Sequence, residues 1–164
     1  MRSFFIVSYK RIILSIASLF VFICTTGLAS QNFSSAKTRS LEALCRGNKD
    51  SHKEATLLIQ QGANVCYQDA MGISLSHYAA EKGNLNILSL LGCEGANLCA
   101  GDYMGRTPLS LASAQGHIKI IDYINKRTGL HQVDNYGNGP LHYASSHACP
   151  KTIEFLLKAS WCLC

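Results

Sequence analysis

A short motif recurs along this chain at a nearly constant interval, and this interval restricts the possible folds more than any other feature of the sequence. The motif begins with Asp and ends with Gly, at residues 69–72, 102–105 and 134–137. Successive copies begin 33 and 32 residues apart. Repeats of this length form solenoids, in which each unit buries its apolar face against the next unit. The interval therefore predicts a stack of similar small units.

Each copy of the motif is followed by residues that favour the start of a helix. Ser74, Thr107 and Gly139 take the cap position, and Pro108 and Pro140 come directly after two of these caps. A hydroxyl at the cap satisfies a free helical amide, and proline loses no amide partner in the first turn. We therefore expect one helix to begin at each of these three places.

A second helix is expected in each unit after a tight turn. Gly83 and Gly116 lie where the first helix must end, since glycine tolerates positive φ. Ala148 takes this place in the last unit, where either Ala148 has positive φ at a cost of about 1 kcal/mol or Cys149 and Pro150 give the turn another shape. The apolar residues of the second helices then follow with helical spacing: Leu85, Ile87, Leu88, Leu90 and Leu91; Ile118, Ile120, Ile121 and Ile124; and Ile153, Phe155, Leu156 and Leu157.

The segments after the caps resemble the Thr-Pro-Leu-His signature of the ankyrin-repeat family. Residues 107–110 and 139–142 each keep three of the four signature residues, and residues 74–77 keep mainly the His. An additional unit precedes them, because Gly-Ala-Asn at residues 62–64 recurs at residues 95–97.

The resemblance extends from Lys37 to Ser160 and implies an all-α repeat solenoid. In this family, β-hairpin turns join units that each contain a helix, a turn and a second helix. We expect the ankyrin-repeat domain to span residues 40–164, with units at approximately 40–66, 67–99, 100–131 and 132–164. The last unit should be the weakest, because Ala148 replaces the turn glycine and the chain continues with apolar residues where a solenoid needs a polar outer face.

The first thirty residues have the pattern of an export signal. Lys10 and Arg11 precede an uncharged, largely apolar stretch that continues to Ser30. We expect residues 1–30 to be a signal peptide, with cleavage near Ala29 or Ser30 favoured over a membrane anchor at residues 12–28. A buried helix of the fold is the third interpretation. The expected location is therefore exported, either secreted or periplasmic, or membrane-anchored, and residues 31–39 are expected to be a polar linker.

The charge of the chain is concentrated in this N-terminal segment. The formal net charge is +5, but three basic residues lie before Ile12. From Ser30 onward the sequence has 12 Lys and Arg against 10 Asp and Glu. No nucleic-acid partner is therefore expected. Membrane association is possible only through the N-terminal segment.

The resemblance implies a protein-protein interaction module that binds another protein. In the ankyrin-repeat family, the row of hairpin tips and inner helices forms the concave binding surface. The expected tips are rich in Tyr, Met and Arg, which are common at protein interfaces, although Met71 and Met104 could instead pack between adjacent hairpins. The expected partner-binding residues are Ala70, Met71, Ile73, Glu81, Lys82, Tyr103, Met104, Arg106, Ala114, Gln115, Asn135, Tyr136, Asn138, Ser146 and His147.

The alternative function is a cryptic enzyme or metal-binding domain that uses surface His, Cys or Ser side chains. The sequence shows no phosphate-binding loop, no paired His with metal-ligand spacing and no acidic dyad. His77 and His142 take the signature position, where the resemblance implies hydrogen bonds that join neighbouring loops. We therefore expect neither catalysis nor a cofactor.

The eight cysteines give conflicting indications. An exported domain favours disulfides. Cys66 and Cys99 take equivalent positions in successive units, where stacked helices lie about 8–10 Å apart, and a disulfide needs Cα atoms within about 7 Å. Free thiols are therefore favoured, although this sits poorly with export.

Overall fold

The computed structural model describes residues 35–47 and 51–161. The segment expected to be a signal or anchor, residues 1–30, lies outside these described residues. The fold described below is that of one compact unit of the chain, which begins at Lys37. A first helix covers residues 35–46. The others are α2 (His52–Gln60), α3 (Leu75–Glu81), α4 (Leu85–Cys93), α5 (Pro108–Gln115), α6 (Ile118–Thr128), α7 (Pro140–Ser146) and α8 (Pro150–Trp161).

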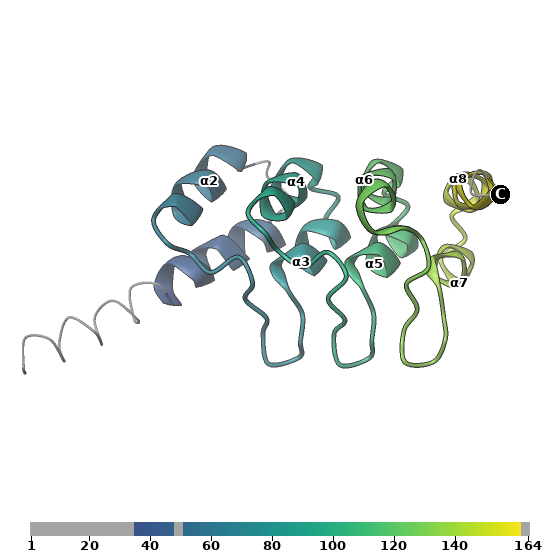
Figure 1. The fold of residues 1–164 in the computed structure, drawn as a ribbon, viewed down its shortest axis with the longest axis horizontal. Helices are drawn as coiled ribbons and strands as arrows, with labels where there is room; N and C mark the ends of the chain where they lie inside the picture. Colours follow the sequence, from purple (N-terminus) through teal and green to yellow (C-terminus); the bar gives the residue numbers. More distant parts are fainter. Residues whose placement is uncertain (1–34, 48–50, 162–164) are drawn as a thin grey trace, which may run out of the picture. The chain divides into compact units, whose positions relative to one another are not determined.

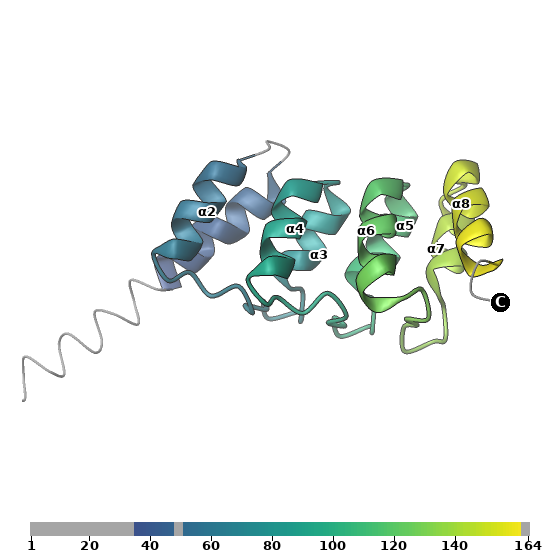
Figure 2. The ribbon, with the colours of Figure 1, turned by 45° about the horizontal axis from the view of Figure 1, so that its top comes forward.

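The helices stack in two rows, and long loops project from one side of the stack (Figure 1). The first helix, α3, α5 and α7 form the inner row, while α2, α4, α6 and α8 form the outer row (Figure 2). Neighbours within the inner row pack closely, with α5 between α3 and α7. This is the all-α repeat solenoid that the sequence predicts. No strand forms in the described residues, and the loops hold one isolated antiparallel bridge between Gln68 and Ser74.

The first helix begins inside the segment that was expected to be a linker, so that expectation is wrong for residues 35–39. Tertiary contacts explain the difference. Thr38 is 4% exposed, and its Oγ1 accepts the amide hydrogen of Asn64 at 3.0 Å. Lys37 Nζ donates to the carbonyl of Gln61 at 2.8 Å. These polar residues are held against the end of α2, which a local sequence pattern does not reveal.

The predicted starts of the inner helices are confirmed. Ser74, Thr107 and Gly139 are the N-caps of α3, α5 and α7, and all three have extended backbone angles. Thr107 Oγ1 accepts the amide hydrogen of Ser110, while proline opens both α5 and α7. Cap chemistry in the sequence therefore determines where the inner row begins in each unit.

The turns between inner and outer helices have left-handed backbone angles. The φ values are 79° at Gly83, 78° at Gly116 and 52° at Ala148. Ala148 is the one non-glycine residue with positive φ in the described part of the chain. The turn therefore has a left-handed residue in each of these three units. In the last unit this residue is Ala148, so the first of the two expected outcomes is observed and the turn is strained by about 1 kcal/mol.

The core runs along the stack between the two rows. Its side chains are aliphatic and almost fully enclosed, which is expected because each repeat covers the next. Exposure is 1% or less for Leu75, Ile87, Leu88, Leu91, Leu109, Ile120, Ile121, Ile124 and Leu156.

A side chain at the start of each later outer helix reaches back to the preceding unit. In every case it donates to a backbone carbonyl near the end of the inner helix of the preceding unit. The donors are Asn84 Nδ2 to Gly47 at 3.1 Å, His117 Nε2 to Glu81 at 3.0 Å and Cys149 Sγ to Ala114 at 3.5 Å. A thiol is a weak donor, so the last of these links is the weakest. In agreement, α8 packs chiefly against α7.

Candidate protein-interaction surface

Each projecting loop is organised by the Asp that begins the recurring motif. One carboxylate oxygen of this Asp accepts the amide hydrogens of the residues two and four positions later, which closes the loop around its tip. The distances are 2.8 and 2.9 Å at Asp69, 2.9 and 2.9 Å at Asp102, and 2.9 and 2.8 Å at Asp134. Two backbone bonds to one carboxylate fix the conformation of each tip.

The other carboxylate oxygen ties the loop to the inner helix in two of the three units. Tyr78 donates to Asp69 at 2.6 Å, and Tyr143 donates to Asp134 at 2.7 Å. Burial and the bond to the carboxylate raise the pKa of both tyrosines to about 12. Burial alone would raise the pKa of Asp134, but the bonds from Tyr143, Asn138 and the backbone outweigh it and lower this pKa to about 2.

The middle unit replaces this bond with an ion pair. Leu111 stands where the other units have Tyr, and it cannot donate to Asp102. Arg106 makes the contact instead, with its Nε and Nη2 both 2.8 Å from Asp102 Oδ2. The middle loop is therefore closed by an ion pair within the loop, whereas the other two loops are bonded to the inner helix of their unit.

Neighbouring loops are also bonded to each other. The amide of Tyr103 donates to Met71 at 3.2 Å, and the amide of Asn135 donates to Met104 at 3.1 Å. Asn135 Nδ2 donates to the carbonyl of Tyr103 at 3.0 Å. Gly105 has φ of 77°, and a Cβ there would lie 2.6 Å from the amide nitrogen of Asn135. The loops therefore form one continuous, well-ordered row.

The large side chains at the loop tips face solvent. Exposure is 60% at Met71, 71% at Tyr103, 46% at Met104 and 74% at Tyr136. The side chains of Met71 and Met104 are therefore not buried between adjacent hairpins. Ala70, Lys82 and Asn135, which were also expected to bind a partner, are exposed.

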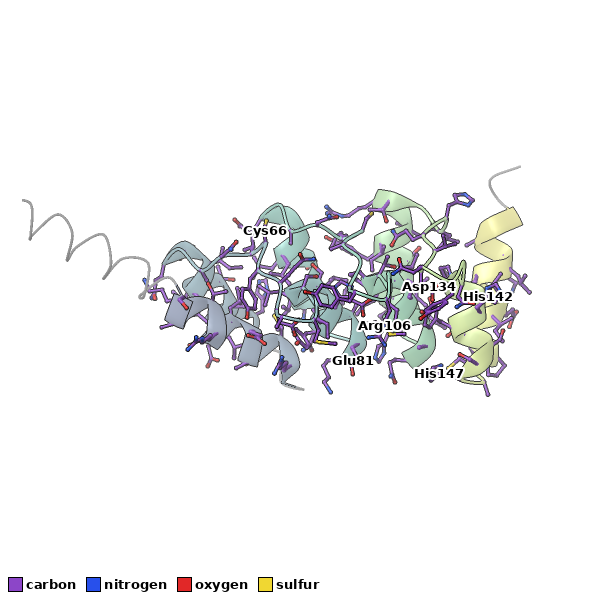
Figure 3. All side chains as sticks on the ribbon, turned by 90° about the horizontal axis from the view of Figure 1, so that it is seen from below. Cys66, Glu81, Arg106, Asp134, His142 and His147 are labelled. Atoms are coloured by element: carbon purple, nitrogen blue, oxygen red, sulfur yellow. The ribbon has the colours of Figure 1, made fainter. Side chains whose placement is uncertain are left out.

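A hollow between the loops and the inner helices brings together six of the expected partner-binding residues. It has a volume of about 320 Å³ and is lined in part by Ile73, Glu81, Arg106, Ala114, Gln115 and His147. Figure 3 shows Glu81, Arg106 and His147 on the same face of the stack. Ala114 is only 6% exposed, so it contributes to the floor of this hollow.

A second hollow continues the surface toward the last unit. Its volume is about 280 Å³, and Asn138, His142, Tyr143 and Ser146 line it. Tyr143 lines both hollows, so they are neighbours on this face. Two more of the expected residues, Asn138 and Ser146, therefore lie in the second hollow.

His77 has the structural role that the resemblance implies. Its Nδ1 accepts the amide hydrogen of Ser74 at 3.0 Å, so Nε2 carries the proton and donates to the carbonyl of Arg106 at 2.8 Å. Burial lowers the pKa of His77 below its ordinary 6.5. Ser74 Oγ lies 2.7 Å from Nδ1, but both side chains are enclosed, which leaves this Ser–His pair no access to a substrate.

Some residues that shape this surface were not identified from the sequence. They are the three motif aspartates, Tyr78 and Tyr143 as their partners, and Arg46, whose guanidinium lies 4.4 Å from the centre of the Tyr78 ring. A signal for the aspartate partners was present, because Tyr follows Asp by nine positions in two units. In the unit that lacks this Tyr, Arg follows Asp by four positions.

Across residues 35–47 and 51–161, no three His, Cys, Asp or Glu side chains gather as metal ligands. The same residues include no helix that is long and apolar enough to cross a membrane. The five cysteines in these ranges, Cys45, Cys66, Cys93, Cys99 and Cys149, are free thiols.

The comparison with protein families agrees with this geometry. A family model described as "Ankyrin repeats (3 copies)" matches residues 41–129 and, overlapping them, residues 99–162. The chain therefore belongs to the ankyrin-repeat family, whose members are generally protein-protein interaction modules and typically not enzymes. No curated protein matches this chain.

Proposed function

We propose that this protein binds a partner protein through the concave surface formed by its loop tips and inner helices. The exposed side chains of Met71, Tyr103, Met104 and Tyr136 carry this proposal. Seven large hydrophobic side chains are exposed in the described residues, and these four all lie at the loop tips. An exposed apolar and aromatic group on one face is typical of a binding surface.

The rigidity of the loops supports the same proposal. Each tip is closed by two bonds to an Asp carboxylate, and adjacent tips are bonded to each other. Binding costs free energy when loops must become ordered, and preformed loops reduce this cost. The tips can therefore present Tyr103 and Tyr136 to a partner at a small entropic penalty.

The experiment compares partner capture with folding. Tagged wild-type protein is used to capture partners from cells of the source organism, and the partner identified by mass spectrometry is then purified and titrated. Changing Tyr103 and Tyr136 together to Ala should weaken binding, with each true anchor costing about 2 kcal/mol or more. Melting temperature should change little, because the tips lie outside the stacked core.

Leu57→Ala is the matched control, because Leu57 is 55% exposed but lies on the outer helix α2. This variant should bind as the wild type does. If the double variant binds normally, or loses binding only because it unfolds, the outer helical face becomes the candidate surface.

We further propose that residues 1–30 direct export or anchor the chain in a membrane. The basic residues followed by an apolar stretch support this proposal. Fractionation of tagged protein, with the mass of its N-terminus measured, tests it. A mature start near Ser30 supports export by a cleaved signal, an intact Met1 in the membrane fraction supports the anchor, and an intact Met1 in the cytosol contradicts both.

A further inference from the structure

The hollow beneath the loop tips is large enough for one long side chain of a partner. Its volume is about 320 Å³, and one water molecule takes about 30 Å³ in the liquid. Ile73 and Leu111 supply apolar lining, and Tyr143 supplies an aromatic side chain. Glu81, Gln115 and His147 supply the polar lining.

Most of the polar groups in this hollow are already bound within the chain. Asp102 has a side chain only 3% exposed, and it is paired with Arg106 at 2.8 Å. The hydroxyl of Tyr143 donates to Asp134 at 2.7 Å. His147 Nδ1 lies 3.0 Å from Ser146 Oγ and 3.2 Å from the carbonyl of Tyr143. These groups have their partners without any ligand.

Glu81 differs from the other two carboxylate and guanidinium groups of the hollow, Asp102 and Arg106, which are paired with each other. Its backbone carbonyl accepts from His117 Nε2 at 3.0 Å. Its carboxylate, however, makes no ion pair and no hydrogen bond with the described residues. Lys82 follows it in the chain but is exposed and does not line the hollow. The charge of Arg106 is offset by Asp102, so the carboxylate of Glu81 is the uncompensated charge in the described lining.

The lining as a whole fits a long basic side chain. Lysine and arginine place apolar stems against hydrophobic surface while the charged head reaches a polar partner. A carboxylate can accept two parallel bonds from a guanidinium, and a tyrosine ring attracts a cation placed over its face. Glu81, Leu111 and Tyr143 supply these three features in one hollow.

We propose that this hollow receives an arginine or lysine side chain of the partner protein, with Glu81 as its counter-ion. This inference rests on the proposed function and names the chemistry of the partner. Glu81 is then a specificity-determining residue: it selects partner segments that carry a basic side chain at one position.

The test uses a random twelve-residue peptide library displayed on phage as the probe. The library is selected against the wild type and against Glu81→Gln, Glu81→Lys and Glu94→Gln. Glu94 is the matched control, since it is an exposed carboxylate at the end of α4, outside the hollow. Thermal melts establish that each variant is folded. Peptides that depend on the concave surface are identified by loss of binding to the variant with both Tyr103→Ala and Tyr136→Ala.

The wild type and Glu94→Gln should enrich peptides with Arg or Lys at one position, and Glu81→Gln should lose this preference. Glu81→Lys should favour acidic peptides instead. For one selected peptide, Glu81→Gln should weaken binding about tenfold or more, because a charge-assisted bond is lost. Surface-dependent peptides without a basic preference, or a preference that Glu81→Gln retains, would overturn this inference alone. A selection that yields no surface-dependent peptide would contradict the proposed function as well.

Discussion

The second and last units carry the same signature His in different surroundings. In both units Nδ1 accepts the amide hydrogen of the N-cap residue, at 3.0 Å for His77 and 3.2 Å for His142. His77 is fully buried and its Nε2 also bonds to the next loop, whereas His142 is exposed. The cap bond therefore depends only on the local segment, whereas burial of the imidazole depends on the neighbouring unit. A repeat therefore gains part of its stability from the unit stacked on it.

The same difference appears at other equivalent positions. Ser113 on α5 is fully buried, and its counterpart Ser145 on α7 is exposed. Leu109 is fully buried, and its counterpart Leu141 is only partly buried. Chemically identical substitutions in the two units should therefore have unequal effects.

The largest difference is expected for the two leucines. Leu109→Ala should lower the free energy of unfolding by about 3 kcal/mol, because it removes a fully buried side chain and leaves a cavity. Leu141→Ala should cost about 1 kcal/mol or less, because the transfer free energy scales with the area buried. Urea denaturation followed by circular dichroism measures both. Equal losses would show that the last unit is covered as completely as the inner ones.

A smaller difference is expected for the two histidines. His77→Asn should cost about 1–3 kcal/mol, because the partners of the imidazole stay buried without their bonds. The exposed His142 should tolerate the same change with a loss of about 0.5 kcal/mol. Equilibrium denaturation at pH 7.5 measures both values, and a cost for His142→Asn as large as that for His77→Asn would contradict the comparison.

The same variants test a pH dependence. Since the pKa of His77 is lowered from 6.5 in the folded state, the unfolded state binds more protons once the pH falls below 6.5. The stabilisation from neutral His77 is therefore complete above pH 6.5 and is lost as the pH falls through the folded pKa. His77→Asn should flatten this slope between pH 6.5 and 5, while His142→Asn should retain it. A slope that persists in His77→Asn would have to come from another group.

The smallest expected effect concerns the strained turn. Ala148→Gly should stabilise the protein by about 1 kcal/mol, because glycine adopts φ of 52° without strain. Gly116→Ala should destabilise it by about the same amount at the equivalent turn. Hydrogen exchange measures the local effect: amides of α7 and α8 should exchange before those of α3 to α6, and Ala148→Gly should slow them. Uniform protection across the units would contradict a weak last unit.

Much of the fold could be read from local chemistry. The caps at Ser74, Thr107 and Gly139 and the positive φ at Ala148 were all predictable, because they depend on a few adjacent residues. The helical turn at residues 35–39 was missed, because contacts from Lys37 and Thr38 to the end of α2 stabilise it.

The site was predicted less completely than the fold. The sequence indicated which side chains stand at the loop tips, and that Tyr, Met and Arg are frequent among them. It did not indicate the ion pair between Arg106 and Asp102. This pair takes the place of the Tyr–Asp bond of the other two units, because Leu111 stands at the position of the Tyr. Nor did it separate the buried Ala114 from the exposed Gln115, because their exposure depends on the neighbouring unit.

The amino-acid sequence alone was enough to predict the repeat period, the starts of α3, α5 and α7, the turn positions and the ankyrin-repeat family. These follow from backbone preferences and hydrophobic spacing, which act over a few residues or recur at a fixed interval. Only the folded structure shows that Glu81 lines a hollow and has no counter-charge among the described residues, while Asp102 is paired with Arg106. Stacking brings together residues that are some 30 positions apart in the chain, so the surroundings of a charged side chain depend on the neighbouring unit.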